Sequence, residues 1–145
     1  MIRDDAKVTR MELKKINPES LKIPTNSYSQ GIVIPLGNID LMFVTGQVAQ
    51  DKEGHVIEPN NARVQTEVVF ARIETILAEH EMNLGDVVKA QIFITNMEDR
   101  QTVTEIRNEI FKNIRPVSTL VGVTGLAKEG CCVEIEVTAV RERQP

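Results

Sequence analysis

The stretch that most constrains the fold is residues 115–140, where two strand-like runs flank a loop that contains Gly130. In the second run, one set of alternating residues is apolar and the other is polar: Val133, Ile135, Val137 and Ala139 against Glu134, Glu136 and Thr138. Because strand side chains repeat every two residues, this alternation predicts a strand with one buried face. The two runs together predict a β-hairpin. A solvated edge strand would show the same alternation, so the pattern alone does not identify a site.

Four other segments have the β-branched and apolar character of strands, and they are residues 11–16, 29–36, 40–48 and 87–96. The second and third flank Gly37-Asn38, a pair of residues typical of the turn in a β-hairpin. The sequence therefore predicts that residues 29–36 and 40–48 are neighbouring antiparallel strands.

Two segments have the period of an amphipathic helix. The first is predicted over residues 62–81, with Asn60 or Asn61 as its N-cap. The second is predicted over residues 98–114, where Pro116 stops it, and its buried stripe would be Val103, Ile106, Ile110 and Ile114. The element order is thus β-β-β-α-β-α-β-β, which predicts an α+β fold with one mixed sheet and two helices.

One domain accounts for this chain of 145 residues. We expect the domain to span residues 11–142, between a flexible N-terminal segment at 1–10 and a solvated tail at 143–145. No apolar run approaches the ~18 residues of a membrane span, and no signal-peptide core follows the first residues. We therefore expect a cytoplasmic protein that does not contact membranes.

Both faces of the predicted sheet carry apolar side chains, yet two helices can cover only one of them. The uncovered face is expected to hold Leu41, Phe43, Phe93 and Leu120. An exposed apolar patch of this kind usually marks a partner surface. We therefore predict self-association through the sheet, with small-molecule sites where the subunits meet.

The charge balance disfavours nucleic acid as the main ligand. The chain has 17 basic and 21 acidic side chains, one Tyr and no Trp, and no Lys/Arg stripe interleaved with aromatic residues. Binding to the phosphate backbone of a nucleic acid needs such a stripe, and base stacking needs exposed aromatic rings. The expected ligand is a small molecule.

The sequence predicts no metal site and no cofactor. Cys131 and Cys132 are adjacent, so they make a poor disulfide and no metal site of their own, and we expect two half-buried small apolar residues. His55 and His80 lack a Cys or carboxylate at metal or triad spacing and are expected at the surface. Phosphate-binding and zinc motifs are absent from the sequence.

Five short segments, taken together and in this order, resemble the RidA/YjgF family of enamine/imine deaminases: residues 28–30, 43–48, 87–94, 115–119 and 133–137. The resemblance extends over about residues 11–141. It implies a chorismate-mutase-like fold and a homotrimer, with helices outside, sheets packed inside and clefts between subunits. The predicted two-faced sheet agrees with that arrangement.

The resemblance is incomplete at the residue that would hold a substrate carboxylate. In deaminating members, an Arg two residues after the Pro of the penultimate strand has that role, and here this position is Ser118. A hydroxyl cannot make the bidentate, charge-assisted contact of a guanidinium. Arg115 lies three residues earlier, at the opposite strand parity. The usual 2-imino acids are therefore not the expected substrates.

At the other positions that the resemblance implies for the ligand site, some residues differ from those common in the family and some are the same. Glu98 and Arg100 stand where an Asn and an aromatic residue are common, and Leu120 replaces a pocket Cys. The retained positions are Tyr28, Thr45, Gly46, Phe93 and Glu136. With Ser118, the changed and retained residues form the predicted ligand site.

Two functions fit these residues. In the first, the protein hydrolyses a carbon–nitrogen bond of an enamine, imine or related small molecule in an intersubunit cleft. Glu136 would activate water, and Thr45 with backbone groups of Gly46 and Ser118 would polarise the substrate. In the second, a non-catalytic trimer binds a small metabolite or a client protein in the same clefts. A weaker third hypothesis is the RNA cleavage, or inhibition of translation, attributed to some family members.

Each of these side chains also has an ordinary structural interpretation. Glu136 and Glu134 could belong to a solvated strand face, and Thr45 could reflect β-propensity alone. Tyr28 either closes the cleft or packs against the domain. Arg100 either supplies a substitute cation or is an exposed helix residue.

Overall fold

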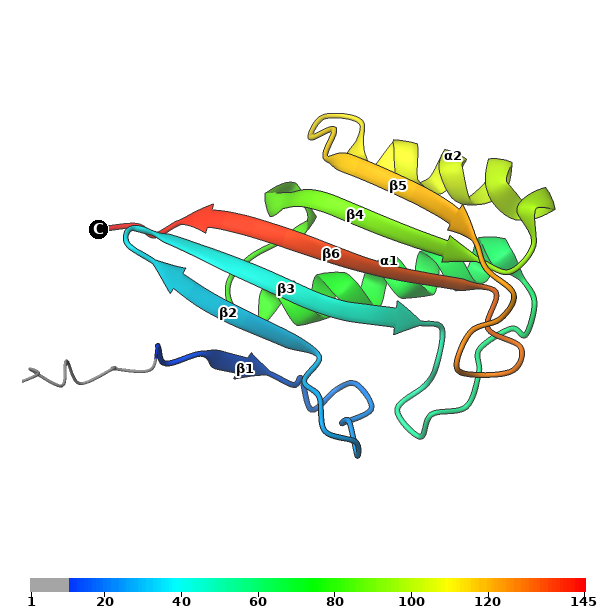
Figure 1. The fold of residues 1–145 in the computed structure, drawn as a ribbon, viewed down its shortest axis with the longest axis horizontal. Coiled ribbons are helices and arrows are strands. Elements are labelled where there is room, and N and C mark those ends of the chain that lie inside the picture. Colours follow the sequence, from blue (N-terminus) through cyan, green and yellow to red (C-terminus); the bar gives the residue numbers. More distant parts are fainter. Residues whose placement is uncertain (1–10) are drawn as a thin grey trace, which may run out of the picture.

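Six strands form one mixed sheet in residues 11–145, which are the residues that the computed structural model describes (Figure 1). Their bounds are β1 Lys14–Ile16, β2 Gly31–Leu36, β3 Ile39–Val48, β4 Val87–Ile94, β5 Val117–Gly122 and β6 Val133–Glu142. The spatial order is β1-β2-β3-β6-β4-β5, and all neighbours are antiparallel except β4 and β5. The predicted flexible segment, residues 1–10, lies outside the described residues.

The predicted hairpin over residues 115–140 is wrong, because β4 lies between β5 and β6 (Figure 1). Helix α2, Arg100–Phe111, carries the chain from the end of β4 back to the start of β5. The two strands therefore run parallel, as a crossover connection requires. The loop of residues 123–132 then brings the chain to the other side of β4, where β6 pairs with both β3 and β4.

The predicted hairpin at Gly37-Asn38 is confirmed. Leu36 of β2 pairs with Ile39 of β3, and Gly37 between them has φ of 61°, a conformation that suits a residue without Cβ. Further along β3, the register with β6 shifts between Val44 and Gln47. This bulge sets the backbone of Thr45 and Gly46 apart from the regular ladder.

The first predicted helix is confirmed as α1, Ala62–Ala78, and Asn61 Oδ1 caps it by accepting a hydrogen bond from Val64 N at 3.2 Å. The second, α2, is shorter than predicted and follows a 3-10 turn at Met97–Asp99. Its Val103 is buried, but Phe111 is buried in place of Ile114, which is exposed. Phe111 meets Phe70 of α1 edge to face, with ring centroids 5.5 Å apart. No helix in residues 11–145 has the length and apolar character to cross a membrane.

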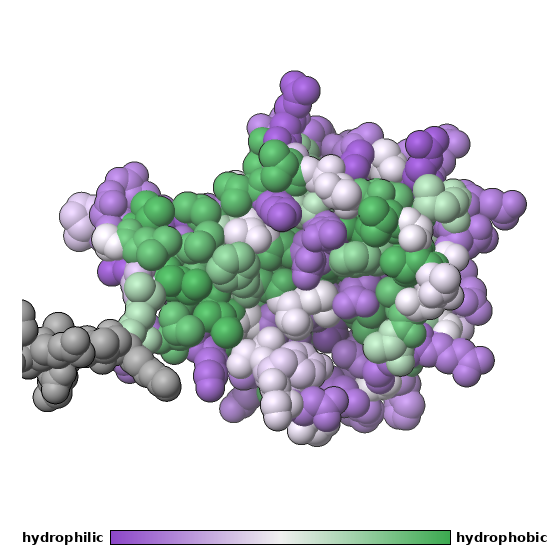
Figure 2. Space-filling view, in the orientation of Figure 1, coloured by the Kyte–Doolittle hydropathy of each residue, from purple (hydrophilic) through white to green (hydrophobic). Residues whose placement is uncertain are grey.

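Both helices lie behind the sheet in Figure 1 and cover one of its faces. The apolar set of β6 belongs to that covered core, as do Met42, Val44, Ile92 and Ile94. Leu41, Phe43 and Phe93 lie on the other, open face, as predicted, and Phe43 is 47% exposed. Leu120 does not: it is paired with Ile92 and packs against the core. Apolar residues gather on the open face (Figure 2).

The C-terminal end of β6 is tied to the β2–β3 hairpin. Arg143, expected to begin a solvated tail, donates its backbone N–H to Asn38 O and its Nε to Asp40 Oδ1, both at 2.8 Å. His80, expected at the surface, is 2.9 Å from the other Asp40 oxygen and only 22% exposed. The Asp40 carboxylate of β3 thus contacts the turn after α1 and the residue after β6.

Candidate functional site

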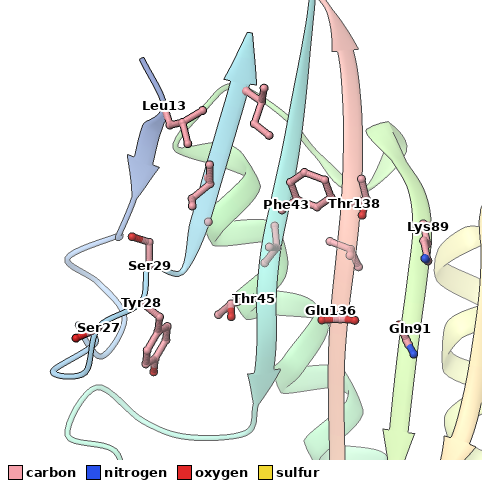
Figure 3. A pocket seen from close by; sticks show the side chains of 15 residues that line it. Leu13, Ser27, Tyr28, Ser29, Phe43, Thr45, Lys89, Gln91, Glu136 and Thr138 are labelled. Carbon is pink, nitrogen blue, oxygen red and sulfur yellow. The ribbon is translucent and has the colours of Figure 1, made fainter. Parts of the chain in front are cut away.

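A pocket of 680 Å³ lies on the open face of the sheet, and we call it the sheet-face pocket (Figure 3). Its walls come from β2, β3, β4 and β6 and from the segment before β2. Tyr28, Thr45 and Glu136, three of the predicted site residues, line it. Lys89 and Gln91 of β4 complete the side beyond Glu136, where Gln91 is the direct partner of Glu136.

A second pocket, of 480 Å³, lies beyond the bulge of β3, and we call it the loop pocket. The segment of residues 22–28 forms one wall, and Gly46, Gln50, Lys128 and Glu134 line the rest. Tyr28 and Thr45 line both pockets. The two hydroxyl side chains therefore stand between two adjoining cavities, each with a carboxylate from β6.

Gly46 is required by the position of the Glu134 side chain. A Cβ built on Gly46 would overlap the Glu134 carboxylate, which lies directly over this backbone. The bulge in β3 and the glycine together make room for a carboxylate against the sheet surface. Glu134 is also paired with Phe93 of β4, which places the Phe93 ring beside it on the open face.

The proton affinity of Glu134 is raised by its surroundings. Burial raises the pKa of Glu134 above its usual value, and the nearby charge of Glu136 raises it further. From the sequence we expected Glu136, and not Glu134, to act in catalysis, and a solvated strand face was the alternative for both. In the sequence, Glu134 differs from Glu136 in lying beside the loop that precedes β6, and this was the only local sign of a different environment. The partial burial of Glu134 depends on Gly46, which is distant in sequence.

Three buried side chains support the site from the helix side of the sheet, and none of the three was among the predicted site residues. Gln30, Gln47 and Arg72 are each at most 5% exposed. Arg72 Nε donates to Gln47 Oε1 at 3.2 Å, Gln47 Nε2 donates to Gln30 Oε1 at 2.7 Å, and Gln30 Nε2 donates to Lys22 O at 2.9 Å. This chain of hydrogen bonds joins α1 to the bulge of β3 and to the 22–28 segment. It holds both walls of the loop pocket.

Within one chain, the other predicted site residues do not lie beside Glu136; they are Ser118, Leu120, Glu98 and Arg100. Ser118 pairs with the buried Ala90, so its side chain lies on the helix-covered face together with that of Leu120. Its Oγ accepts a hydrogen bond from Arg107 Nη1 of α2 at 3.3 Å. Glu98 and Arg100 are exposed around the start of α2 and line neither pocket. Tyr28, Thr45, Gly46 and Phe93 are the predicted residues that lie with the two glutamates.

Two other groups of reactive side chains lie apart from the pockets. Ligand atoms of Asp51, Glu53 and His55 lie within 4.8 Å of one another on a loop, and with three ligands from an open loop we assign no ion to them. Cys131 and Cys132 precede β6 and are fully buried free thiols, not half-buried strand residues. Burial raises the pKa of Cys132 to about 11, which makes this thiol a poor nucleophile.

Comparison with known families gives one consistent match. The family model described as endoribonuclease L-PSP matches residues 20–141. A RutC family protein of Pyrococcus abyssi is 32% identical over 132 residues, which cover 91% of this chain and 100% of the relative. A protein of Dermatophagoides farinae named 2-iminobutanoate/2-iminopropanoate deaminase is 28% identical over 119 residues, covering 82% of this chain and 89% of that protein.

Solved structures have the same fold. The YjgF gene product of E. coli superposes with a TM-score of 0.75 at 27% identity, covering 89% of this chain and 99% of that one. E. coli TdcF with bound serine gives a TM-score of 0.75 at 26% identity, with the same coverage of both chains. The mixed sheet and its two helices are thus common to the three proteins.

The raised pKa of Glu134 predicts a specific dependence of stability on pH. Because the folded protein disfavours ionised Glu134, the contribution of this residue to the free energy of unfolding is fully present below the ordinary pKa of glutamate. It is lost as the pH rises through the raised value. As the pH rises above the ordinary pKa of glutamate, about 4.3, wild type should therefore lose stability relative to Glu134→Gln in urea unfolding.

Glu129→Gln, in the exposed loop before β6, is the matched control and should follow the wild-type curve. Parallel pH profiles for wild type and Glu134→Gln would show that the Glu134 carboxyl is not buried.

Proposed function

The chain belongs to the endoribonuclease L-PSP family, the family of the RidA and YjgF proteins, and on this premise we propose that it hydrolyses a carbon–nitrogen bond of a small enamine or imine. The observation that carries the proposal is Glu134, a carboxyl group with a raised pKa that faces a pocket lined by Tyr28 and Thr45. Such a group is protonated closer to neutral pH than an ordinary glutamate and is suited to proton transfer.

The chemistry needs a proton donor and an activated water molecule. Hydrolysis of an imine adds water to the carbon of the C=N bond, transfers protons to the nitrogen and releases the amine, leaving a carbonyl. Glu134 is proposed as the acid that protonates the nitrogen. Glu136, two residues away on the same strand face, is proposed as the carboxylate that orients and activates water. Thr45 and Tyr28 supply hydroxyl groups that orient the substrate between the pockets.

The proposed substrate differs from the usual 2-imino acids of the family. Ser118 stands at the position of the carboxylate-binding Arg, and its hydroxyl is already engaged by Arg107. A small-molecule substrate is favoured over RNA because the chain has a net charge of −4 and its basic residues form no stripe along the pockets.

The active form is proposed to be a homotrimer that packs through the open sheet face. Exposed Phe43 and the apolar residues around it would be costly to leave in water. The family resemblance implies a trimer with its sheets packed inside, which would cover this face. The sheet-face pocket opens on the same surface, so the proposed site lies at a seam between subunits.

Removing the proposed acid should abolish activity without unfolding the protein. For Glu134→Gln we expect kcat for a small enamine or imine to fall by about 10²- to 10⁴-fold, the usual effect of losing a general acid or base. Glu136→Gln should lose activity as well, since it removes the second carboxylate. The measurement is ammonia release, with the exposed Glu129→Gln as control.

If Glu134→Gln keeps full activity, Glu134 is not the acid. If wild type is stabilised by small amines or imine analogues in thermal unfolding but releases no ammonia, the protein is a binding protein and the hydrolase proposal is wrong.

Restoring the missing guanidinium should widen the substrate range. Because β5 is an edge strand of the sheet, we propose that a long side chain at position 118 reaches the cleft of a neighbouring subunit in the trimer, although Ser118 lies away from Glu136 of its own chain. We therefore expect Ser118→Arg, combined with Arg107→Ala to remove the neighbouring like charge, to raise kcat/KM for freshly generated 2-iminobutanoate by about tenfold or more. Arg107→Ala alone is the control. A wild type already as fast as the double variant would show that the carboxylate contact is supplied elsewhere.

The trimer is tested by light scattering coupled to size-exclusion chromatography. Wild type should elute with three times the chain mass of 16.2 kDa. Phe43→Lys places a charge on the open face and should reduce the mass to that of one chain. Met97→Lys, at an exposed apolar residue beside Gly122 on the helix-covered side of the sheet, should remain trimeric. A monomeric wild type at micromolar concentration would contradict the proposed assembly.

A further inference from the structure

A second surface of the domain, away from both pockets, has a groove of its own. This groove, which we call the helix groove, has a volume of 520 Å³ and runs between α1 and α2. Both helices lie behind the sheet in Figure 1, so the groove is on the opposite side of the molecule from the open sheet face. Its floor is apolar and is formed by Phe70, Ala71, Leu84, Ile106 and Ile110.

The chain itself does not fully cover the floor of the helix groove. Ile106 and Ile110 belong to the stripe of α2 that the sequence predicts to be buried, yet both are only half-buried. Leu84 is half-buried too, and Ala71 of α1 is exposed. Phe70 closes the bottom of the groove and is buried. An apolar strip of this kind between polar edges is typical of a surface that a partner covers.

The rim of the helix groove is acidic. It has four exposed glutamates, which come from both helices: Glu67 and Glu74 from α1, Glu105 and Glu109 from α2. Among residues 11–145, Arg63 is the one cation that lines the groove. Within the same residues, Glu67 and Glu74 have no ion-pair partner. Four carboxylates thus stand with one guanidinium around an apolar floor.

The ion pairs that do form on the rim are weak. Arg63 Nη2 lies 3.4 Å from Glu105 Oε2, and Lys112 Nζ lies 2.7 Å from Glu109 Oε1. All four side chains are more than half exposed, and exposed pairs contribute little to stability. Glu105 and Glu109 are also four residues apart on α2, a spacing at which like charges repel each other. A cationic partner would therefore relieve a repulsion that the chain leaves largely uncompensated.

The charges and the floor together decide between classes of occupant. Lys and Arg side chains complement an acidic rim, and complementary charges favour both encounter and specificity. The phosphate groups of a nucleic acid or of an anionic membrane would be repelled by the same rim. Because the floor is apolar, the occupant must also present apolar side chains to it. The helix groove thus fits a segment that is basic along its edges and apolar on one side.

The length of the helix groove favours a helix over a small amine. Along α1 its lining residues extend from Arg63 to Glu74, a span of about 16 Å at the rise of an α-helix. About three turns of a docked helix fit in that span, and an amphipathic helix presents apolar side chains every three or four residues. A small amine would contact one part of the rim and leave the rest of the floor in water.

We propose that the helix groove binds a basic amphipathic helix of a partner protein. The apolar side of that helix lies on Ile106 and Ile110, and its Lys or Arg side chains pair with Glu67 and Glu74. In the proposed trimer the subunits pack through the open sheet face, so the groove behind the sheet stays accessible. The proposal does not depend on the hydrolysis proposed above, because no residue of the groove lines either pocket.

The experiment measures, by fluorescence anisotropy, the binding of the full chain to a labelled peptide of about 15 leucine and lysine residues patterned as an amphipathic helix. One control peptide has the same composition in scrambled order, and the other has glutamate in place of lysine. We expect the patterned basic peptide to bind about tenfold more tightly than either control, and its affinity to fall as the NaCl concentration rises. Equal affinity for the patterned and the scrambled peptide, or no binding of the patterned peptide, overturns the proposal.

Charge variants test whether the peptide binds at the rim. Glu67→Gln with Glu74→Gln should weaken its affinity by about fivefold or more, since two exposed ion pairs are lost. Glu53→Gln with Glu129→Gln is the matched control, because it removes the same charge from exposed loops outside the groove and should bind as wild type does. Equal affinities of the two double variants overturn the proposal.

A third pair of variants tests the floor. Ala71→Lys places a cation in the groove and should weaken peptide affinity by about fivefold or more, whereas Ala78→Lys, at an exposed residue of α1 outside the groove, should not. If n-octylamine displaces the peptide with the same affinity as the unlabelled peptide, the groove takes a small amine and the proposal is overturned. A wild-type mass in light scattering that falls in Ala71→Lys but not in Ala78→Lys would assign the groove to a second copy of this chain, which also overturns it.

Discussion

The rest of the structure depends on the position of β6 between β3 and β4. A strand paired on both sides must present alternate residues to the two faces of the sheet. In β6, one set packs under the two helices as the centre of the core. The other set, with Glu134 and Glu136, is thereby forced onto the open face beside the pockets. The packing that stabilises the domain and the placement of its carboxylates are consequences of the same alternation.

The pockets depend on an interruption of regular pairing in the neighbouring strand. The bulge of β3 and Gly46 allow the Glu134 carboxylate to lie against the sheet, which lowers its exposure to water. The buried network from Arg72 through Gln47 holds this irregular backbone in place. The irregular backbone and the buried charge both cost stability, and both occur next to the proposed site, where strain and unpaired charge commonly accompany function.

Local patterns predicted most elements but not the order of the strands. The β2–β3 hairpin and helix α1 were predicted correctly because a glycine turn and an asparagine cap act on residues close in sequence. Pairing of β5 with β6 was wrong because nothing within 115–140 indicates that β4 lies between them. The same error placed Leu120 on the open face, since the face of β5 depends on its register with β4.

For the candidate site, too, local patterns predicted some features, and others depended on the tertiary structure. By its period of two, the sequence alone determined that Glu134 and Glu136 share one face of a strand, and it determined that Ser118 stands where related proteins have an arginine. Only the tertiary structure decided that Gly46 makes room for the Glu134 carboxyl, that Ser118 faces α2, and that Arg72 donates to Gln47 beneath the bulge of β3. Burial and charge compensation depend on side chains brought together from distant parts of the chain, and no local pattern contains that information.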